Sequence, residues 1–356
     1  DHLIARFGDD VFTLLIEGND KAAAEVLAET IRTTAEEHMF EASGKNYQVT
    51  LSIGLSMIAE NTSTVEQAIS RAYQASDSIE EGNAIAFYEP KNPTVGEDGQ
   101  SISADTLKAL VSHALDEDQF KLNFQPIISL HGEDEEQFEV LLRLPDAEGN
   151  ALRPGQFMGP AEDAGLLQKI DRWVVFHAIK QLAKQREAGG KARLFINVSH
   201  KILADEEFLP WMSVTLKASK LASDSIVFQL QENDATSYIK QAAKFTKGLQ
   251  ELHIKSSINH FGCSLNPFNL LKHLTPNIVK LDGSFANEIE KNEEKREELI
   301  KIVRSLQASG VLTAISGVED PSTLPTLFMT GINYIQGNYI SEPLDDIDYD
   351  FSSEGL

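Results

Sequence analysis

The sequence predicts an α/β protein in which an irregular TIM-type (β/α)8 barrel, residues 105–348, follows part of a smaller α/β domain, residues 1–90. Three observations lead to this prediction. After residue 104, eight apolar strand-like segments recur over about 240 residues, and most of the later ones precede a helical pattern. Residues 91–104 begin with proline, glycine and acidic residues that lack an apolar period, which is typical of a linker. The 356 residues, 42% of them hydrophobic, are enough for two packed cores.

The first domain alternates strands and helices. Residues 3–15 read as two strands joined by a turn, and 21–40 read as an amphipathic helix. Residues 47–58 alternate like a single strand, 64–80 have helical spacing, and 84–90 supply a last strand.

The predicted barrel strands are short apolar segments rich in β-branched and aromatic residues. They are 120–130, 137–144, 193–199, 225–231, 254–261, 277–282, 311–316 and 333–340. Only HGEDEEQ, with no helical pattern, lies between the first two, so we expect them to form a hairpin and the barrel to be irregular at its start. Helices are expected over 171–187 and 291–309, and residues 349–356 read as a C-terminal tail.

Composition limits the partners. The net charge is −24, from 31 basic and 55 acidic residues, which argues against a nucleic-acid polymer or an anionic membrane as a partner. The single cysteine, Cys263, excludes an intramolecular disulfide and fits a reducing, cytoplasmic location. No apolar run has transmembrane length and no signal peptide is visible, so we expect no membrane insertion. The start at DHLIARFG suggests a piece of a longer protein.

Polar residues recur at the strand ends of the predicted barrel, where barrel enzymes carry their chemistry. In chain order they are Gln125, Glu139, Asn197, Gln229, Asn259 with His260, Lys280, Ser316 and Gln336. This ring contains one carboxylate and one lysine among amides. It is compatible with a functional site, and equally with the incidental polarity of any barrel mouth.

The segments FQPIISL, FEVLLRL, INVS, FQLQE, INHFG, VKLD, SGVE and IQGNYISEPL resemble the EAL domain family of cyclic-di-GMP phosphodiesterases, in the same order and with similar spacing. Glu139-Val140-Leu141 stands where that family has Glu-Ala-Leu. The first domain, through ARFGDDVFTLL and VTLSIGLSMI, resembles the C-terminal portion of a GGDEF, or diguanylate cyclase, domain. The resemblance implies an irregular TIM barrel and cyclic-di-GMP as ligand.

The resemblance also implies a carboxylate-rich site for two divalent cations, and this site is degenerate here. Four of its acids are replaced, by Gln229, Asn259, His260 and Ser316. One remaining carboxylate, Glu139, is too little for a pair of hard cations. We therefore expect no metal, no cofactor and no catalysis. His260 reads either as a weak transition-metal ligand or as a hydrogen-bonded loop residue, and Glu139 is expected to pair with Lys280.

The binding residues implied by the resemblance are better kept than the metal ligands. Arg143 is expected to contact a phosphate, with Gln125 nearby, since a guanidinium group matches phosphate oxygens. Asp171 and Glu319 correspond to positions that contact guanine edges. The whole expected ligand-binding set is Gln125, Glu139, Leu141, Leu142, Arg143, Asp171, Asn197, Lys280, Glu319, Gln336 and Pro343, with the two leucines and the proline lining the base pockets.

Each of these residues also has a structural interpretation. Asp171 could cap a helix that starts at Arg172. Arg143 could pair with a neighbouring acid, and Glu319 could simply face solvent. We favour ligand binding because all of them occur together in the right motifs.

In the first domain, Gly8-Asp9-Asp10-Val11-Phe12 departs from the Gly-Gly-Asp/Glu-Glu-Phe signature, so we expect no cyclase activity and a scaffold or regulatory role. Degenerate tandems of these two domains imply a cyclic-di-GMP receptor that regulates type IV pili and twitching motility. The expected partners are a PilZ-domain adaptor and the pilus assembly ATPase, and homodimerisation stays open. The alternatives are a docking scaffold that binds no nucleotide and a weak cyclic-di-GMP phosphodiesterase.

Overall fold

A computed structural model describes most of the chain, as two compact units, Asp1–Lys91 and Asn92–Leu356. The described residues are 3–6, 11–16, 21–42, 45–58, 65–79, 82–88, 102–132, 136–146, 148–264, 267–289 and 292–351. Residues Gly8, Asp9 and Asp10 of the signature motif and most of the expected linker lie outside them.

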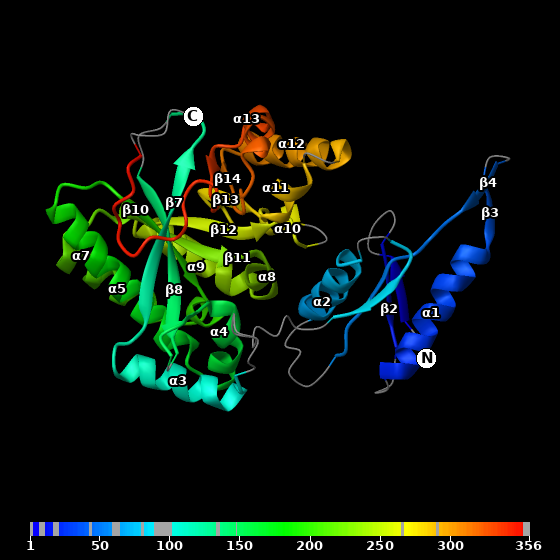
Figure 1. Cartoon of the computed structure of the whole chain (residues 1–356), viewed down its shortest axis with the longest axis horizontal. Coiled ribbons are helices and arrows are strands. Elements are labelled where there is room, and N and C mark those ends of the chain that lie inside the picture. Colours follow the sequence, from blue (N-terminus) through cyan, green and yellow to red (C-terminus); the bar gives the residue numbers. More distant parts are fainter. Residues whose placement is uncertain are drawn as a thin grey trace. The chain divides into compact units, whose positions relative to one another are not determined.

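Among its described residues, the first unit contains three separate pairs of strands and two helices. Its elements are β1 (Leu3–Arg6), β2 (Phe12–Leu15), α1 (Lys21–Glu37), β3 (Met39–Ala42), β4 (Lys45–Gln48), β5 (Ile53–Leu55), α2 (Val65–Asp77) and β6 (Ile85–Phe87). Of these, Figure 1 labels α1, α2 and the strands β2 to β4. The β1–β2 and β3–β4 pairs are antiparallel and the β5–β6 pair is parallel. The expected hairpin at the start and the two helices are therefore present.

The single strand predicted over 47–58 is wrong. The chain pairs with β3 up to Gln48 and then changes partner, so that β5 begins at Ile53 and pairs with β6. Helix α2 crosses β5 at Gly54, where an added Cβ would lie 1.8 Å from the carbonyl oxygen of Ala72. Only glycine allows this close approach of helix and strand.

The second unit is built on a closed ring of strands. They are β7 (Lys121–Ser129), β8 (Gln137–Pro145), β10 (Arg193–Val198), β11 (Ile226–Gln231), β12 (Lys255–Phe261), β13 (Ile278–Leu281), β14 (Leu312–Ile315) and β15 (Tyr334–Ile335). Neighbours pair in chain order, and the pairing of β10 with β8 closes the ring. Strand β7 is antiparallel to both neighbours, β8 and β15, while the other pairs are parallel. The predicted irregular barrel with an initial hairpin is confirmed.

Helices lie around the outside of the ring (Figure 1). They are α3 (Ala104–Asp116), α4 (Pro154–Asp163), α5 (Leu167–Glu187), α6 (His200–Leu203), α7 (Phe208–Ser219), α8 (Glu232–Ser237), α9 (Ile239–Glu251), α10 (Pro267–Leu270), α11 (Ser284–Glu288), α12 (Glu293–Ala308) and α13 (Leu324–Thr330). A two-residue strand that the sequence did not predict, β9 (Ala151–Leu152), pairs with the end of β8. None of the helices in the described part of the chain is long and apolar enough to cross a membrane.

Two details differ from the predictions for the barrel. The strand expected over 333–340 is only Tyr334–Ile335, because the chain leaves the sheet in turns after Ile335. The last residues described, within the segment read as a tail, are packed: the ring of Phe351 lies 5.2 Å from that of Phe138 on β8, and 4.9 Å from that of Tyr349.

Side-chain alternation along the strands divides the barrel interior into layers. An apolar layer consists of Ile127, Phe195, Val227, Ile278, Ala314 and Tyr334, with Leu312 against it. On five of these strands, the residue two positions after the apolar one is polar. Because side chains alternate between the two faces of a strand, this polar side chain also points into the barrel. These residues are Asn197, Gln229, Lys280, Ser316 and Gln336. On β7 the polar residue, Gln125, comes two residues earlier, because this strand runs in the opposite direction.

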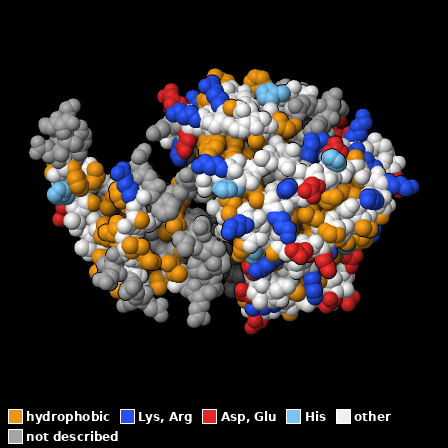
Figure 2. Space-filling view, turned by 180° about the vertical axis from the view of Figure 1, so that it is seen from behind, with side chains coloured by type: hydrophobic (Ala, Val, Ile, Leu, Met, Phe, Trp, Pro, Cys, Tyr) orange, Lys and Arg blue, Asp and Glu red, His pale blue; other side chains and the backbone are white. Residues whose placement is uncertain are grey.

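The opposite faces of the strands pack against the helices and form the large core of the unit. On β8, for example, Phe138, Val140, Leu142 and Leu144 belong to this core. On the surface, basic, acidic and apolar side chains are interspersed over the visible face (Figure 2).

Candidate functional site

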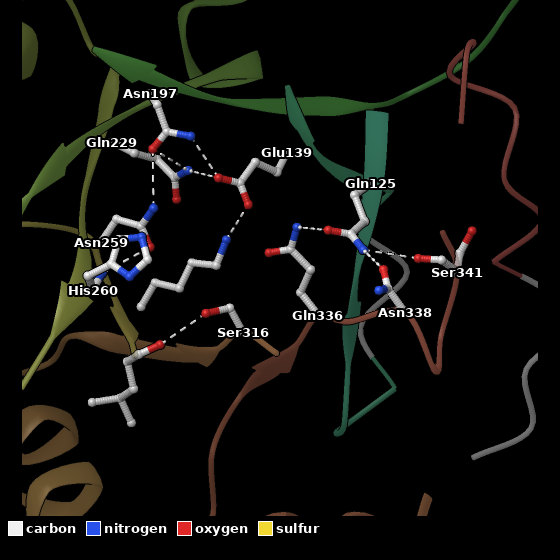
Figure 3. Close-up of polar contacts among 12 residues, drawn as sticks. Gln125, Glu139, Asn197, Gln229, Asn259, His260, Ser316, Gln336, Asn338 and Ser341 are labelled. Atoms are coloured by element: carbon white, nitrogen blue, oxygen red, sulfur yellow. Dashed lines mark hydrogen bonds and ion pairs between the residues drawn. The ribbon is translucent and has the colours of Figure 1, made fainter. Parts of the chain in front are cut away.

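The polar layer at the barrel mouth is a connected hydrogen-bond network around Glu139 (Figure 3). One carboxylate oxygen accepts hydrogen bonds from the amides of Asn197 at 2.7 Å and Gln229 at 2.9 Å. The other oxygen accepts a hydrogen bond from the ammonium group of Lys280 at 2.5 Å. Glu139 and Lys280 are 6% and 2% exposed, so bulk water does not reach this pair. The expected ion pair is confirmed.

The carboxyl group of Glu139 stays ionised although it is buried. Burial acts to raise its pKa, but the positive charge of Lys280 and the hydrogen bonds from Lys280 and Asn197 outweigh burial and hold the pKa at about 2. Glu139 and Lys280 therefore form a buried ion pair without net charge.

Uncharged side chains occupy the other positions of the layer. Asn259 and Gln229 donate to the same oxygen, Oδ1 of Asn197, at 3.2 and 3.3 Å. The hydroxyl of Ser316 donates to the carbonyl of Leu281 at 3.4 Å. Within the described part of the chain, no three His, Cys, Asp or Glu side chains lie close enough to hold a metal ion. The layer lacks the concentration of anionic oxygen ligands that two divalent cations need.

His260 does not point into the layer. Its side chain is 53% exposed, and its Nδ1 lies 2.7 Å from a carboxylate oxygen of Asp282. The register of β12 against β13 shifts between Ile258 and Phe261, and His260 has a left-handed φ of 54° there. Such a bulge re-aims a side chain. The hydrogen bond from His260 is the main reason that the pKa of Asp282 lies well below its usual range. The hydrogen-bonded interpretation of His260 fits this geometry.

Arg143 lies at the end of β8, on the strand face that carries Glu139 and Leu141. Its guanidinium group is half-buried and donates to the carbonyl of Leu142 at 2.9 Å. Burial and the neighbouring positive charge of Arg153 lower its pKa. The alternative, an ion pair with a nearby acid, is not found among the described residues. Two arginines thus concentrate positive charge at this end of β8.

Of the residues expected to line the base pockets, Leu141 and Pro343 are half-buried, whereas Leu142 is buried in the core behind the barrel. Glu319, three residues after Ser316, is exposed.

Asp171 lies within α5 and not at its start, because that helix begins at Leu167, so the helix-cap interpretation is wrong. Asp171 is 4% exposed, and its carboxylate accepts hydrogen bonds from the backbone N–H of Ser199 at 3.2 Å and from the Ser199 hydroxyl at 2.6 Å. The same serine caps α6 by accepting from the N–H of Lys201. Asp171 therefore holds the turn that begins two residues after Asn197.

This buried carboxyl group predicts a pH dependence of stability. Burial raises the pKa of Asp171 to about 7, although the hydrogen bonds from Ser199 act to lower it. The unfolded chain releases this proton near pH ~4 and the folded chain keeps it to about pH 7, so Asp171 makes stability fall as the pH rises between these values. We expect Asp171→Asn to flatten the decline, measured as urea unfolding at about pH 5 and about pH 7.5. An unchanged pH dependence would contradict this assignment.

Residues 336–343 form a loop at the barrel mouth, here called the rim loop. From this loop, only Gln336 and Pro343 were predicted from the sequence to belong to the site. Gln336 donates to Oε1 of Gln125 at 2.9 Å. Gln125 in turn donates to Oδ1 of Asn338 at 3.2 Å and to the carbonyl of Ser341 at 3.1 Å (Figure 3). Asn338 and Ser341 lie in what was expected to be a strand and its end, which is why sequence reasoning missed them.

Glu232 is a second residue that sequence reasoning missed. It follows β11 directly, is 1% exposed, and accepts hydrogen bonds at 3.0 Å from the backbone N–H groups of both Gly262 and Cys263. The hydroxyl of Ser264 also donates to it. Glu232 thus fixes the loop after β12. An acid directly after a buried strand was the available signal, since parallel strands end at the same edge.

Comparison with known proteins agrees with this architecture. Residues 109–343 match the EAL domain family, and residues 1–83 match the diguanylate cyclase, or GGDEF, domain family. The crystal structure of the FimX EAL domain from Pseudomonas aeruginosa, bound to c-di-GMP, is 45% identical and has a TM-score of 0.66, covering 69% of this chain and 99% of that chain. The FimX EAL domain of Xanthomonas citri in complex with c-diGMP is 26% identical, with a TM-score of 0.66 over 70% of this chain and 97% of that chain.

Curated relatives include proteins named as enzymes. The cyclic di-GMP phosphodiesterase PdeR of Escherichia coli is 26% identical over 98% of this chain and 52% of its own length. PdeF, from the same organism, is 28% identical over 67% of this chain and 32% of its own length. The chain thus spans about half, or less, of the length of these relatives. The chain belongs to the EAL domain family, as a FimX-like protein in which a GGDEF domain precedes the EAL barrel.

Proposed function

We propose that this chain is a cyclic-di-GMP receptor that holds the dinucleotide at the mouth of its EAL barrel without a metal and does not hydrolyse it. The observation that carries the proposal is the electrical neutrality of the polar layer. Glu139 is neutralised by Lys280, and the other six positions of the layer carry uncharged side chains. The likeness to FimX EAL domains solved with c-di-GMP supports the choice of ligand.

Metal-assisted hydrolysis requires several anionic ligands to hold two cations that activate water. In this layer the one carboxylate already has three donors: Asn197, Gln229 and Lys280. Binding a divalent cation at Glu139 would mean placing it beside the ammonium group of Lys280, at a large electrostatic cost in a buried site. A ligand with two phosphates, in contrast, is repelled less by a polar layer without net charge than by a layer rich in carboxylates.

Arg143 is proposed as the main phosphate contact. It is half-buried, no acid among the described residues neutralises it, and Arg153 adds a second positive charge nearby. A half-buried guanidinium group without an acidic partner gains a pair of charge-assisted hydrogen bonds when it binds a phosphate. Gln125 is proposed to hydrogen-bond the ligand near the same phosphate, while Leu141 and Pro343 contact the bases.

The test of catalysis is the fate of the nucleotide. After prolonged incubation of the chain with cyclic-di-GMP and excess Mg²⁺ or Mn²⁺, chromatography is expected to recover the cyclic ligand intact. Linear pGpG that appears only with metal, and that disappears in a Glu139→Gln variant, would instead establish a weak phosphodiesterase. The relatives named as phosphodiesterases make this the second candidate function.

Guanine recognition is proposed for the carboxylates of Glu319 and Asp171, which can accept hydrogen bonds from N1–H and N2–H₂ of the base. Glu319 is exposed and available, whereas Asp171 must exchange its bonds to Ser199 for those of the base. We expect Glu319→Gln to reduce the preference for guanine over adenine cyclic dinucleotides, and Asp171→Asn to reduce it less. Competition titrations with both ligands measure this preference; equal selectivity in wild type and both variants would remove the two acids from base recognition.

For the whole protein we propose signalling through protein partners in the cytoplasm, with a PilZ-domain adaptor and the pilus assembly ATPase as partners and type IV pili and twitching motility as the output. The GGDEF domain is proposed to act as a scaffold. A docking scaffold that binds no nucleotide is the alternative, and it predicts that cyclic-di-GMP produces no shift in the thermal unfolding midpoint.

A further inference from the structure

The rim loop, residues 336–343, interrupts the pairing of the last strand with β7. Ile335 pairs with Ile128, and Leu344 pairs with Phe124. Between these two pairs β7 advances by four positions, whereas the chain opposite advances by nine. The excess residues cannot lie in the sheet, so they leave it and form a loop at the barrel mouth.

One side of the rim loop is fixed by backbone contacts. The N–H of Val318 donates to the carbonyl of Gln336 at 3.0 Å, and the N–H of Tyr339 donates to the carbonyl of Val318 at 3.2 Å. A Cβ at Gly337 would lie 2.0 Å from that same carbonyl oxygen of Val318, so the two backbones are in contact. This side offers no room for adjustment.

On the β7 side, the amide of Gln125 holds the rim loop, and the backbone of Phe124 exchanges two hydrogen bonds with Leu344, the residue directly after the loop. A glutamine has two N–H donors, and both are used: one for Oδ1 of Asn338 at 3.2 Å, and one for the carbonyl of Ser341 at 3.1 Å. Its oxygen accepts from Gln336 at 2.9 Å. Gln125 thus has no free donor for a ligand while the rim loop stays in this position.

We propose that Asn338 is an affinity-determining residue of the site because it competes with the ligand for the Gln125 amide. This inference rests on the proposed function, in which Gln125 contacts the ligand near a phosphate. A phosphate oxygen is a charged acceptor and forms a stronger hydrogen bond than the neutral amide oxygen of Asn338. Asn338 is exposed and can turn to water when it is displaced. Ligand binding therefore removes the contact between Gln125 and Asn338, and leaves the bond to Ser341, the pairing of Leu344 with Phe124 and the contacts with Val318 in place.

The sign of a mutational effect tests this competition. Removing the competitor in an Asn338→Ala variant is expected to lower the dissociation constant for cyclic-di-GMP by about three- to tenfold. This factor corresponds to the net free-energy contribution of roughly one neutral hydrogen bond. Asn269→Ala, at an exposed asparagine of α10, serves as the matched control and should leave the affinity unchanged. If Asn338 instead positions Gln125 for the ligand, the Asn338→Ala variant binds more weakly. Weaker or unchanged binding overturns the proposal.

Two further measurements connect the effect to Gln125 and to the loop. In a Gln125→Ala background, Asn338→Ala should no longer change the affinity, and a persisting gain would contradict competition. In the wild type, hydrogen exchange of the backbone N–H groups of Ile340 and Ser341, which bond to Gly337 within the loop, should become faster when the ligand is bound. Slower or unchanged exchange would contradict loss of the Asn338 contact. Wild-type chain that fails to bind cyclic-di-GMP refutes the proposed function itself, whereas a binding wild type with an unaltered Asn338→Ala variant refutes this inference alone.

Discussion

Replacing Lys280 with methionine is expected to lower the free energy of unfolding by about 3–5 kcal/mol, because the substitution leaves the carboxylate of Glu139 buried without its counter-charge. The pair is shielded from water, with both residues less than a tenth exposed. Methionine retains most of the volume of the lysine chain, so the loss reports the charge rather than a cavity. Urea unfolding at pH ~7, compared between wild type and variant, measures the effect.

A double variant separates charge from packing. When Glu139→Gln accompanies Lys280→Met, no buried charge remains, and most of the lost stability should return. Asn197 and Gln229 can still donate to the new amide oxygen, which preserves part of the network. Two results would contradict the proposed contribution of this ion pair to stability. One is a Lys280→Met variant whose free energy of unfolding lies within about 1 kcal/mol of wild type; the other is a double variant no more stable than Lys280→Met.

Arg143→Ala is expected to weaken cyclic-di-GMP binding by about 1.5–3 kcal/mol, which corresponds to roughly ten- to a hundredfold in the dissociation constant. The guanidinium group has no acidic partner among the described residues, so its removal should leave the fold of the barrel intact. Titration of the variant in the absence of metal, with thermal unfolding as a check of folding, measures the effect.

Two comparisons sharpen the Arg143 prediction. Arg143→Lys keeps the charge and loses the bidentate geometry, so its affinity should fall between those of wild type and Arg143→Ala. Arg304→Ala, at an exposed arginine of α12, changes the net charge equally and should leave the affinity unchanged. Equal loss in the Arg143→Ala and Arg304→Ala variants would show that only the overall charge matters and would remove Arg143 from the site.

Much of the barrel could be predicted because its strands are buried and their sequences are continuous apolar runs. The polar layer could also be predicted, since alternation places Asn197, Gln229 and Lys280 two positions beyond apolar inward residues. Even the reversed first strand was visible, because HGEDEEQ is too short for a crossover helix. These features depend on local sequence and on the strand period.

The parts that the sequence did not reveal depend on contacts between distant segments. The strand predicted over 333–340 stops at Ile335 because Gly337 must pack against the backbone of Val318. The buried position of Asp171 depends on where α5 meets the turn at Ser199, a tertiary contact that no local pattern encodes. In the first unit, the break after Gln48 reflects a change of partner strand rather than a change in alternation.

Metal-free binding is the central claim, and calorimetric titration of the chain with cyclic-di-GMP in excess EDTA tests it most directly. We predict saturable binding in EDTA with an affinity that added Mn²⁺ does not change, because Lys280 already neutralises Glu139. Absence of binding in EDTA, followed by binding once Mn²⁺ is supplied, would contradict the account and show that the site still depends on a metal.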